Sequence, residues 1–228
     1  MSKTGSLVAV YHSIAFAITA DTMWRGSRPS LLLVALGLSL ISGLAKADGV
    51  VVVCYNWGCL NRQPVSYAEP WLRKALQPLR QAKTPEAERA AAAEVVHRFY
   101  RKAAEQTPIG ADAPGNDEDP SVNGRMDCID HSATTKNILS YLQHRKLLRW
   151  HEVGPYAHRS LLVTSHYSAT LVETDAADDD SGVFVIDPWD VDPLTLPQLA
   201  PVREWAGPRF YSLETQHHTK NPPAALTR

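Results

Sequence analysis

Long apolar runs, an excess of charge of either sign and internal repeats are all missing from this sequence. The longest apolar run, within residues 30–47, has a core of about 15 residues, fewer than the roughly 20 that a helix needs to span a bilayer. The chain has 23 Lys and Arg against 24 Asp and Glu and no basic stripe, which argues against a nucleic-acid-binding protein. No segment repeats at a period of about 20–50 residues, which argues against a solenoid.

Residues 1–47 are nevertheless predicted to be a secretory signal peptide. Two arginines precede the run SLLLVALGLSLISGLAKA, and the small residues Ala45 and Ala47 stand at the positions that specify cleavage before Asp48. The residues before Met23 fit this pattern poorly, so Met23 is an alternative start. An uncleaved membrane anchor is the other interpretation of the run. The prediction places the protein in the periplasm or outside the cell, with no stable membrane span.

The exported part, residues 48–228, is expected to form one domain followed by a tail. About 180 residues are enough to bury a sizeable core. The whole chain has a net charge of −1 and residues 1–47 carry +3, so the exported part carries −4. We expect the domain at residues 48–212 and a flexible tail at residues 213–228. The His217-His218 pair in the tail is expected to be disordered rather than to chelate a metal.

Three elements are predicted in the first half of the domain. GVVVVCY, from Gly49 to Tyr55, is β-branched and apolar and predicts a strand. The segment 67–80 is weakly helical and broken near Pro78. The clearest helix follows Thr84, a favoured N-cap residue with Pro and acids directly after it, and runs to about Glu105. The side chains expected to face the core from this helix are Val95, Val96, Phe99 and Ala103.

The second half is predicted to combine one long helix with strands. A Pro-, Gly- and Asp-rich loop, residues 107–123, leads to a helix at residues 129–146. Cys128 begins one face of this helix, which continues through small and then apolar residues: Ser132, Thr135, Leu139 and Leu142. Strands are expected at residues 161–163, 167–173 and 183–186. The mixture predicts an α+β fold in which the helix that starts near Cys128 packs on an antiparallel sheet.

The three cysteines all lie in the exported part. Cys54 and Cys59 share one short loop, VCYNWGC, and disulfides form and persist in oxidising compartments, so we expect these two to pair. The alternative is that all three are buried thiols. The CX4C spacing has no second Cys/His pair beside it, which disfavours a zinc site. Pairing leaves Cys128 as an odd cysteine in an exported chain.

Cys128, His166 and Asp187 form the candidate catalytic set. The cysteine starts a helix, the histidine begins a strand, and the aspartate ends the next strand, so antiparallel pairing would set His166 beside Asp187. A thiol is mostly protonated at neutral pH, and both a helix N-terminus and an imidazolium favour the thiolate. The histidine would then protonate the leaving group, while the carboxylate would hold one imidazole tautomer. Backbone N–H groups at the helix start, with Asn123 as a second donor, would stabilise an oxyanion.

Each of these residues also has a structural interpretation. A single cysteine is more often buried than catalytic, and an aspartate before a proline often closes a turn. His166 competes with three other histidines. His131 lies one turn from Cys128 and would need an unusual rotamer, whereas His158 is expected in an exposed turn. The third is His151.

The order of the three residues resembles the transglutaminase-like branch of the papain-like cysteine peptidase fold. The matching segments are GRMDCID, SHYSATLVE and GVFVIDPWD, within residues 124–190. The first of them is similar to the bacterial transglutaminase-like cysteine proteinases, a periplasmic group that includes calcium-dependent adhesin-cleaving proteases. The resemblance implies a catalytic role for Cys128, His166 and Asp187. Ser165 stands where the family usually has glycine before the histidine, so the substrate groove of the family is not carried over.

No cofactor and no metal site is predicted. Asp127 and Asp130 flank Cys128 and are expected to be helix caps rather than metal ligands, because Asp is favoured in the first helical turn. The acidic loop after the second predicted strand lacks the EF-hand spacing, so it is expected to be solvated rather than to bind calcium. The acids of this loop are Asp175, Asp178, Asp179 and Asp180.

Three functions are compatible with these features. The first is an exported thiol-dependent amide hydrolase or transferase that acts on a protein or peptide through a thioester. The second is a catalytically inactive binding domain of the same fold, with tryptophans as anchors. The third is a cell-wall peptide hydrolase.

Overall fold

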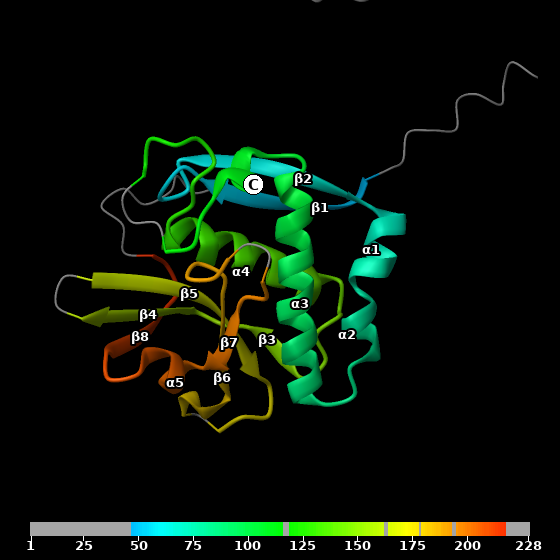
Figure 1. The fold of residues 1–228 in the computed structure, drawn as a ribbon. Helices are drawn as coiled ribbons and strands as arrows, with labels where there is room; N and C mark the ends of the chain where they lie inside the picture. Colours follow the sequence, from blue (N-terminus) through cyan, green and yellow to red (C-terminus); the bar gives the residue numbers. More distant parts are fainter. Residues whose placement is uncertain (1–46, 116–118, 162–163, 178, 193–194, 218–228) are drawn as a thin grey trace, which may run out of the picture. The chain divides into compact units, whose positions relative to one another are not determined.

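The structure of the chain is a computed structural model that describes residues 47–115, 119–161, 164–177, 179–192 and 195–217 (Figure 1). The described residues all belong to one compact unit. Helices and antiparallel strands are both present, which confirms the α+β class. Among these residues, no helix has both the length and the apolar character that crossing a membrane requires. The predicted signal peptide lies outside the described residues, apart from Ala47.

A two-stranded hairpin begins the fold. The expected strand is present as β1 (Ala47–Tyr55), and it pairs antiparallel with β2 (Asn61–Ala68), which was not predicted. Residues 56–60 connect the two strands, and the first four of them have left-handed backbone conformations with φ between 57° and 67°. The disulfide between Cys54 and Cys59 spans this connection, as predicted.

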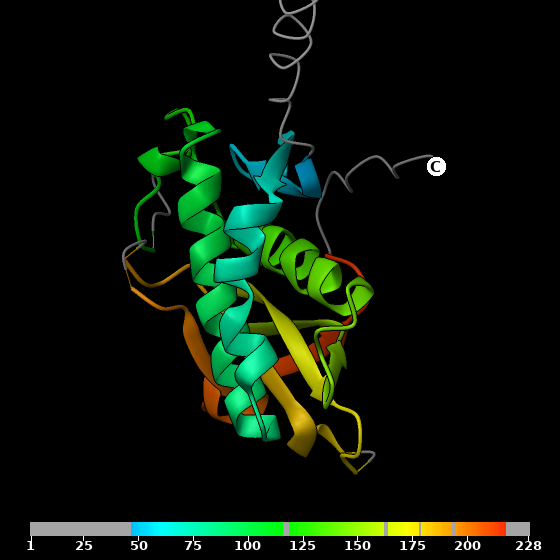
Figure 2. The same cartoon turned by 90° about the vertical axis from the view of Figure 1, so that its right-hand side faces the viewer.

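Three helices and a short 3₁₀ turn follow the hairpin. They are α1 (Glu69–Ala75), α2 (Gln77–Gln81), α3 (Pro85–Ala104) and η1 (Pro108–Ala111). The predicted break near Pro78 is present: it falls at Leu76, and Pro78 stands in the first turn of α2, where proline is tolerated. Thr84 caps α3 by accepting a hydrogen bond from the backbone N–H of Ala87 at 3.2 Å, and the predicted core stripe of this helix is buried. Figure 2 shows α1 and α2 running alongside α3.

The predicted central helix is present as α4 (Cys128–His144), and Cys128 is its first residue. Asp127 and Asp130 form a capping box at its start, which confirms that these acids cap the helix. The helix ends two residues before the predicted position, and the chain turns at Lys146, where φ is 56°. It packs against β1 on one side and against the large sheet on the other.

The large sheet has six antiparallel strands. Its order is β7-β6-β5-β4-β8, and β3 also pairs with β5. The strands are β3 (His151–Val153), β4 (Tyr156–Leu161), β5 (Thr164–Glu173), β6 (Val183–Asp187), β7 (Gln198–Pro201) and β8 (Phe210–Glu214). Two short helical segments complete this part, η2 (Asp180–Gly182) and α5 (Val202–Ala206).

Three predictions for this region need correction. The strand predicted at residues 161–163 runs instead from Tyr156 to Leu161, and residues 162–163 lie outside the described set. His158 therefore lies inside β4 and not in an exposed turn. The folded part also extends past the predicted boundary at residue 212, since β8 continues to Glu214 and the His217 ring packs on Tyr156 with 3.9 Å between centroids.

The two faces of the large sheet bury different clusters. Ala169 and Leu171 of β5 pack with the helices in the main core. The opposite face carries Val183 and Val185 of β6 against Trp205 of α5. Since neighbouring residues of a strand point to opposite faces, this division decides which side each polar residue of β5 and β6 occupies.

Candidate active site

His166 and Asp187 are brought together by the pairing of β5 with β6. Ala169 lies opposite Ile186 in this antiparallel pair, which places both polar side chains on the face that carries Trp205. The imidazole Nε2 lies 2.6 Å from Asp187 Oδ2, and the two residues are only 6% and 2% exposed. The structure thus joins two of the three predicted catalytic residues in a buried pair.

Asp187 is held by three hydrogen bonds. The indole Nε1 of Trp205 donates to Oδ2 at 2.8 Å, and the backbone N–H of Trp189 donates to Oδ1 at 3.3 Å. Burial alone would raise the pKa of the Asp187 carboxyl, but the charge and hydrogen bond of His166, with the two tryptophan donors, outweigh it and lower the pKa below its usual value. The carboxylate is therefore ionised at neutral pH despite its burial.

The ring of His166 has one bonded nitrogen and one without a partner. Because Asp187 accepts at Nε2, that nitrogen carries the proton in the neutral ring, as assigned from the hydrogen-bond pattern. Nδ1 is buried and has no hydrogen-bond partner among the described residues. The ring lies between Trp189 and Trp205, at centroid distances of 4.5 Å and 5.5 Å. The hydrogen-bond pattern therefore assigns one tautomer to the neutral imidazole and leaves Nδ1 as its unprotonated nitrogen.

Cys128 occupies the N-terminal end of a 17-residue helix and lies outside the disulfide. Its side chain is half-buried and packs against a small cluster formed by Cys54, Cys59, Ile129, Ala133 and Tyr167. The helix dipole and the unsatisfied N–H groups of the first turn favour negative charge at this position.

Gly124 sets the path of the chain into this helix. Its φ is 97°, a conformation that L side chains rarely adopt, and an added Cβ would overlap the backbone carbonyl of Pro108. The glycine of GRMDCID is thus required for the approach of the loop to η1.

The disulfide loop is bound directly to the caps of α4. Asp130 accepts from the backbone N–H of Trp57 at 2.7 Å and of Cys59 at 2.6 Å, and Asp127 accepts from Gly58 at 3.0 Å. Burial and the neighbouring Asp127 charge raise the pKa of Asp130 to about 8, although these backbone donors oppose the rise. The VCYNWGC loop, which had no role in the sequence analysis, therefore supports the start of the helix that carries Cys128.

Cys128 and His166 lie on two elements that pack against each other. The helix α4 packs against β5, and both begin on the same side of Figure 1. The cluster around Cys128 includes Tyr167, whereas His166, the preceding residue, points to the face of Trp205. A reaction between the thiol and Nδ1 therefore requires the sulfur to reach the imidazole around the start of β5.

Two of the competing histidines are held in pairs of their own. His131 Nε2 lies 2.8 Å from Asp112 Oδ2, and its ring stacks on Tyr100. His151 Nδ1 lies 2.9 Å from Glu88 Oε1, and both side chains are fully buried. His151 has contacts at both ring nitrogens, from Glu88 and Arg89, and is explained as a structural residue, whereas His131 Nδ1 is buried without a partner among the described residues, as in His166.

His158 is the competitor that sequence reasoning underestimated. It lies opposite Tyr167 in the β4–β5 pair and stacks on that ring at 4.4 Å between centroids. Its Nδ1 lies 3.0 Å from Glu214 Oε1 and its Nε2 lies 2.7 Å from Ser165 Oγ. This His–Glu pair lies on the face of β5 that packs near Cys128. In the sequence, the only sign of this pair is Glu214, which lies in the region predicted to be the tail.

Asn123, the predicted second oxyanion donor, is exposed and takes part in a loop network. Its Oδ1 accepts from Asn56 Nδ2 at 3.0 Å, while Asn56 Oδ1 accepts from the backbone N–H of Gly124 at 2.7 Å. These bonds join the disulfide loop to the segment before α4. The amide nitrogen of Asn123 is the group that would donate to an oxyanion.

A polar cavity of about 530 Å³ opens beside His166. It is lined by Arg159, Thr164, Ser165, His166, Trp189, Asp190 and Arg209.

Comparisons with protein-family models, with curated proteins and with solved structures find no match to this chain. The function is therefore inferred from the geometry of the site.

Proposed function

We propose that the protein is an exported thiol-dependent amide hydrolase or transferase of the transglutaminase-like class, with Cys128 as nucleophile, His166 as acid and base, and Asp187 as the residue that orients the imidazole. The observation that carries the proposal is the buried His166–Asp187 pair, with Nε2 bonded and Nδ1 without a partner among the described residues. The disulfide supports an oxidising compartment.

The proposed reaction is acyl transfer through a thioester. The thiol of Cys128 gives its proton to His166 Nδ1, and the sulfur attacks the carbonyl carbon of an amide. The oxygen of the tetrahedral intermediate takes the negative charge and is stabilised by backbone N–H groups at the start of α4. The imidazolium then protonates the departing amine as the C–N bond breaks. Water or a second amine, deprotonated by His166, attacks the thioester and regenerates the thiol.

Asp187 stabilises the imidazolium that forms in this sequence. Its carboxylate is ionised and is fixed by Trp205 and Trp189, so it accepts the hydrogen bond from Nε2–H in a single orientation. A pre-positioned carboxylate needs little reorganisation when the ring becomes charged.

The test is the reactivity of the thiol in the folded protein. We expect iodoacetamide to alkylate Cys128 at pH 6, and His166→Ala to slow this reaction at least about 100-fold. Alkylation only above about pH 8, as in an ordinary thiol, or equal rates in the wild type and His166→Ala, would exclude the triad.

A bifunctional reagent tests the geometry separately. 1,3-Dibromoacetone joins a thiol to an imidazole only when the two are within about 5 Å, and mass spectrometry identifies the joined peptides. A bridge from Cys128 to His166 is expected. A bridge from Cys128 to His158 would show that the catalytic base is His158, on the opposite face of β5 from His166.

A further inference from the structure

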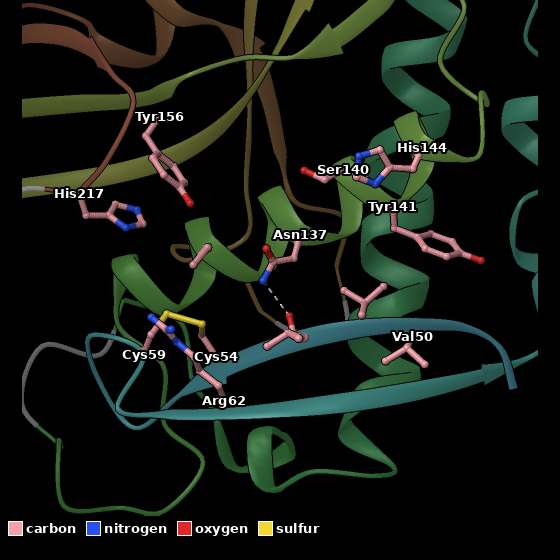
Figure 3. A pocket seen from close by; sticks show the side chains of 13 residues that line it. Val50, Cys54, Cys59, Arg62, Asn137, Ser140, Tyr141, His144, Tyr156 and His217 are labelled. Atoms are coloured by element: carbon pink, nitrogen blue, oxygen red, sulfur yellow. Dashed lines mark hydrogen bonds between the residues drawn. A yellow bond between two sulfur atoms is a disulfide. The ribbon is translucent and has the colours of Figure 1, made fainter. Parts of the chain in front are cut away.

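A second hollow runs along α4, and one end of it is lined by Cys54, Cys59 and Ala133, which belong to the cluster that Cys128 packs against. It has a volume of about 430 Å³, and we call it the β1–α4 groove (Figure 3). Val50, Val51 and Val52 of β1 form one side of it, and Asn137, Ser140 and His144 of α4 form the other. Figure 3 shows the disulfide and His217 at one end and Val50 toward the other. Cys128, His166 and Asp187 do not line it.

One side of the groove is the outer edge of a β-strand. Val52 lies opposite Pro64 and Cys54 opposite Arg62 in the hairpin, and a proline cannot donate to a partner strand. The backbone groups of Val52 and Cys54 accordingly point out of the hairpin: Asn137 Nδ2 donates to Val52 O at 2.9 Å, and Cys54 N donates to Thr134 Oγ1 at 2.9 Å. By the same alternation, the backbone groups of Val50 face the groove. Val50 is 52% exposed, so the edge stays accessible at this end.

The charge of the groove has one sign. Arg62 lines it, and no acidic residue is among the described residues that do. The Nζ of Lys136 adds a second positive group, 4.1 Å from the centroid of Tyr156, a ring that also lines the groove. The neighbouring acid, Glu214, is bound by His158 and by the hydroxyl of Tyr167.

We propose that the β1–α4 groove binds an extended acidic peptide segment. The backbone of the peptide pairs with the edge of β1 at Val50, its apolar side chains cover the valines, and its carboxylates meet Arg62 and Lys136. A peptide fits better than a compact anion because the groove offers a strand edge and apolar surface as well as positive charge. The proposal goes beyond the proposed function, since it uses none of the catalytic residues and holds whether or not Cys128 is a nucleophile.

The binding test compares two fluorescein-labelled hexapeptides in which Val alternates with Glu or with Gln. Six extended residues span about 20 Å. Anisotropy is measured with the purified full-length chain at fixed salt concentration. We expect the Glu peptide to bind at least about tenfold more tightly than the Gln peptide. Absence of binding, or equal binding of the two peptides, would overturn the proposal.

Variants locate the peptide on the surface. Arg62→Gln is expected to weaken binding of the Glu peptide about tenfold, whereas Arg80→Gln, an equal loss of charge at an exposed position in α2, is expected to leave it unchanged. Ser140→Trp fills the groove from the half-buried side of α4 and is expected to abolish binding while the circular dichroism spectrum is retained. Equal losses in Arg62→Gln and Arg80→Gln would show unspecific attraction and contradict the proposal.

Two further controls separate peptide binding from the binding of another polyanion and from the catalytic proposal. A sulfated oligosaccharide that displaces the peptide and binds more tightly would assign the groove to a different polyanion, against the proposal. Cys128→Ser is expected to bind the Glu peptide as the wild type does, so a failure of the catalytic proposal is distinguishable from a failure of this one. Loss of peptide binding in Cys128→Ser would contradict the independence of the two sites.

Discussion

His166 and Asp187 share a 2.6 Å contact across neighbouring strands, and the indole of Trp205 donates to the same carboxylate oxygen at 2.8 Å. In this arrangement Nε2 of the imidazole is hydrogen-bonded, and Nδ1 has no partner among the described residues. A purely structural histidine usually satisfies both nitrogens, as His158 does with Glu214 and Ser165. His131 shows the same pattern as His166, with Asp112 at Nε2 and a buried Nδ1, so the role proposed for His166 rests on this contrast with His158 together with the predicted order of Cys128, His166 and Asp187.

Asp187→Asn is expected to lower the rate of Cys128 alkylation at pH 6 by about 100-fold or more. The amide preserves the shape of the side chain but no longer stabilises an imidazolium, and its NH₂ group favours the wrong tautomer. The measurement is the pseudo-first-order rate with iodoacetamide, with protein folding checked by circular dichroism. An unchanged rate in a folded variant would remove Asp187 from the site.

Trp205→Phe is expected to destabilise the protein by at least about 1–3 kcal/mol, because a buried carboxylate oxygen loses a donor and the smaller phenyl ring leaves a void. Loss of this donor also raises the pKa of Asp187 toward its usual value. The stability that an acid with a depressed pKa contributes is present above its unfolded pKa of about 3.9 and is lost as the pH falls through the folded value. Because the folded pKa of Asp187 then lies closer to the unfolded value, urea unfolding at pH 7 and below pH 4 should show a smaller loss of stability on acidification in the variant than in the wild type, with Trp150→Phe as the control.

His158→Ala is expected to leave alkylation of Cys128 within about threefold of the wild-type rate while lowering stability by about 1 kcal/mol, since Glu214 and Ser165 each lose a hydrogen-bond partner. The two quantities are measured on the same preparation. If the alkylation rate instead falls as far as it does in His166→Ala, the His158–Glu214 pair supplies the base.

Removal of the disulfide is expected to affect both stability and the thiol. The double substitution Cys54→Ser with Cys59→Ser should cost about 2 kcal/mol, the value expected for closure of so short a loop. Because the backbone of this loop donates to both caps of α4, Cys128 alkylation should slow as well. Urea unfolding and alkylation are measured in parallel. A stability loss with no change in alkylation would show that the loop does not position the helix start.

Asp130 predicts a decrease in stability as the pH rises. Its folded pKa, about 8, lies above the unfolded value, so the folded state holds a proton that the unfolded state has released between these two values. Stability should therefore fall between about pH 4 and pH 8, by at most about 1.4 kcal/mol per pH unit from this group. The comparison is urea unfolding of the wild type and Asp130→Asn at pH 5 and pH 8. The slope should be smaller in the variant, and an identical slope would assign the effect to other groups.

Local patterns predicted the elements whose signals lie within a few residues. The Thr84 cap and following proline defined α3, the β-branched run defined β1, and the acids beside Cys128 capped α4 as expected. The Cys54–Cys59 pairing was also predictable, because proximity in the chain limits the choice of partner. These features depend on short-range sterics and hydrogen bonds that neighbouring residues supply themselves.

Other features depended on partners far away in the chain. The strand β2 has weak local signals and is stabilised by β1 and by the side chain of Gln106, which bonds to the backbone of Ser66. The position of His158 inside β4 follows from pairing with β5 and β8 on either side. A strand held between two neighbours gains its stability from those contacts, which a local pattern does not contain.

The amino-acid sequence by itself determined that a cysteine would begin a capped helix, and that a histidine and an aspartate would occupy neighbouring strands. Only the tertiary structure decided which face of the sheet each side chain takes, because a shift of one residue in register moves every side chain of a strand to the other face. That register gives His166 a carboxylate and an indole on one side of β5, and places Tyr167 and the disulfide loop with Cys128 on the other. The proposed reaction between Cys128 and His166 thus depends on how α4 packs at the start of β5.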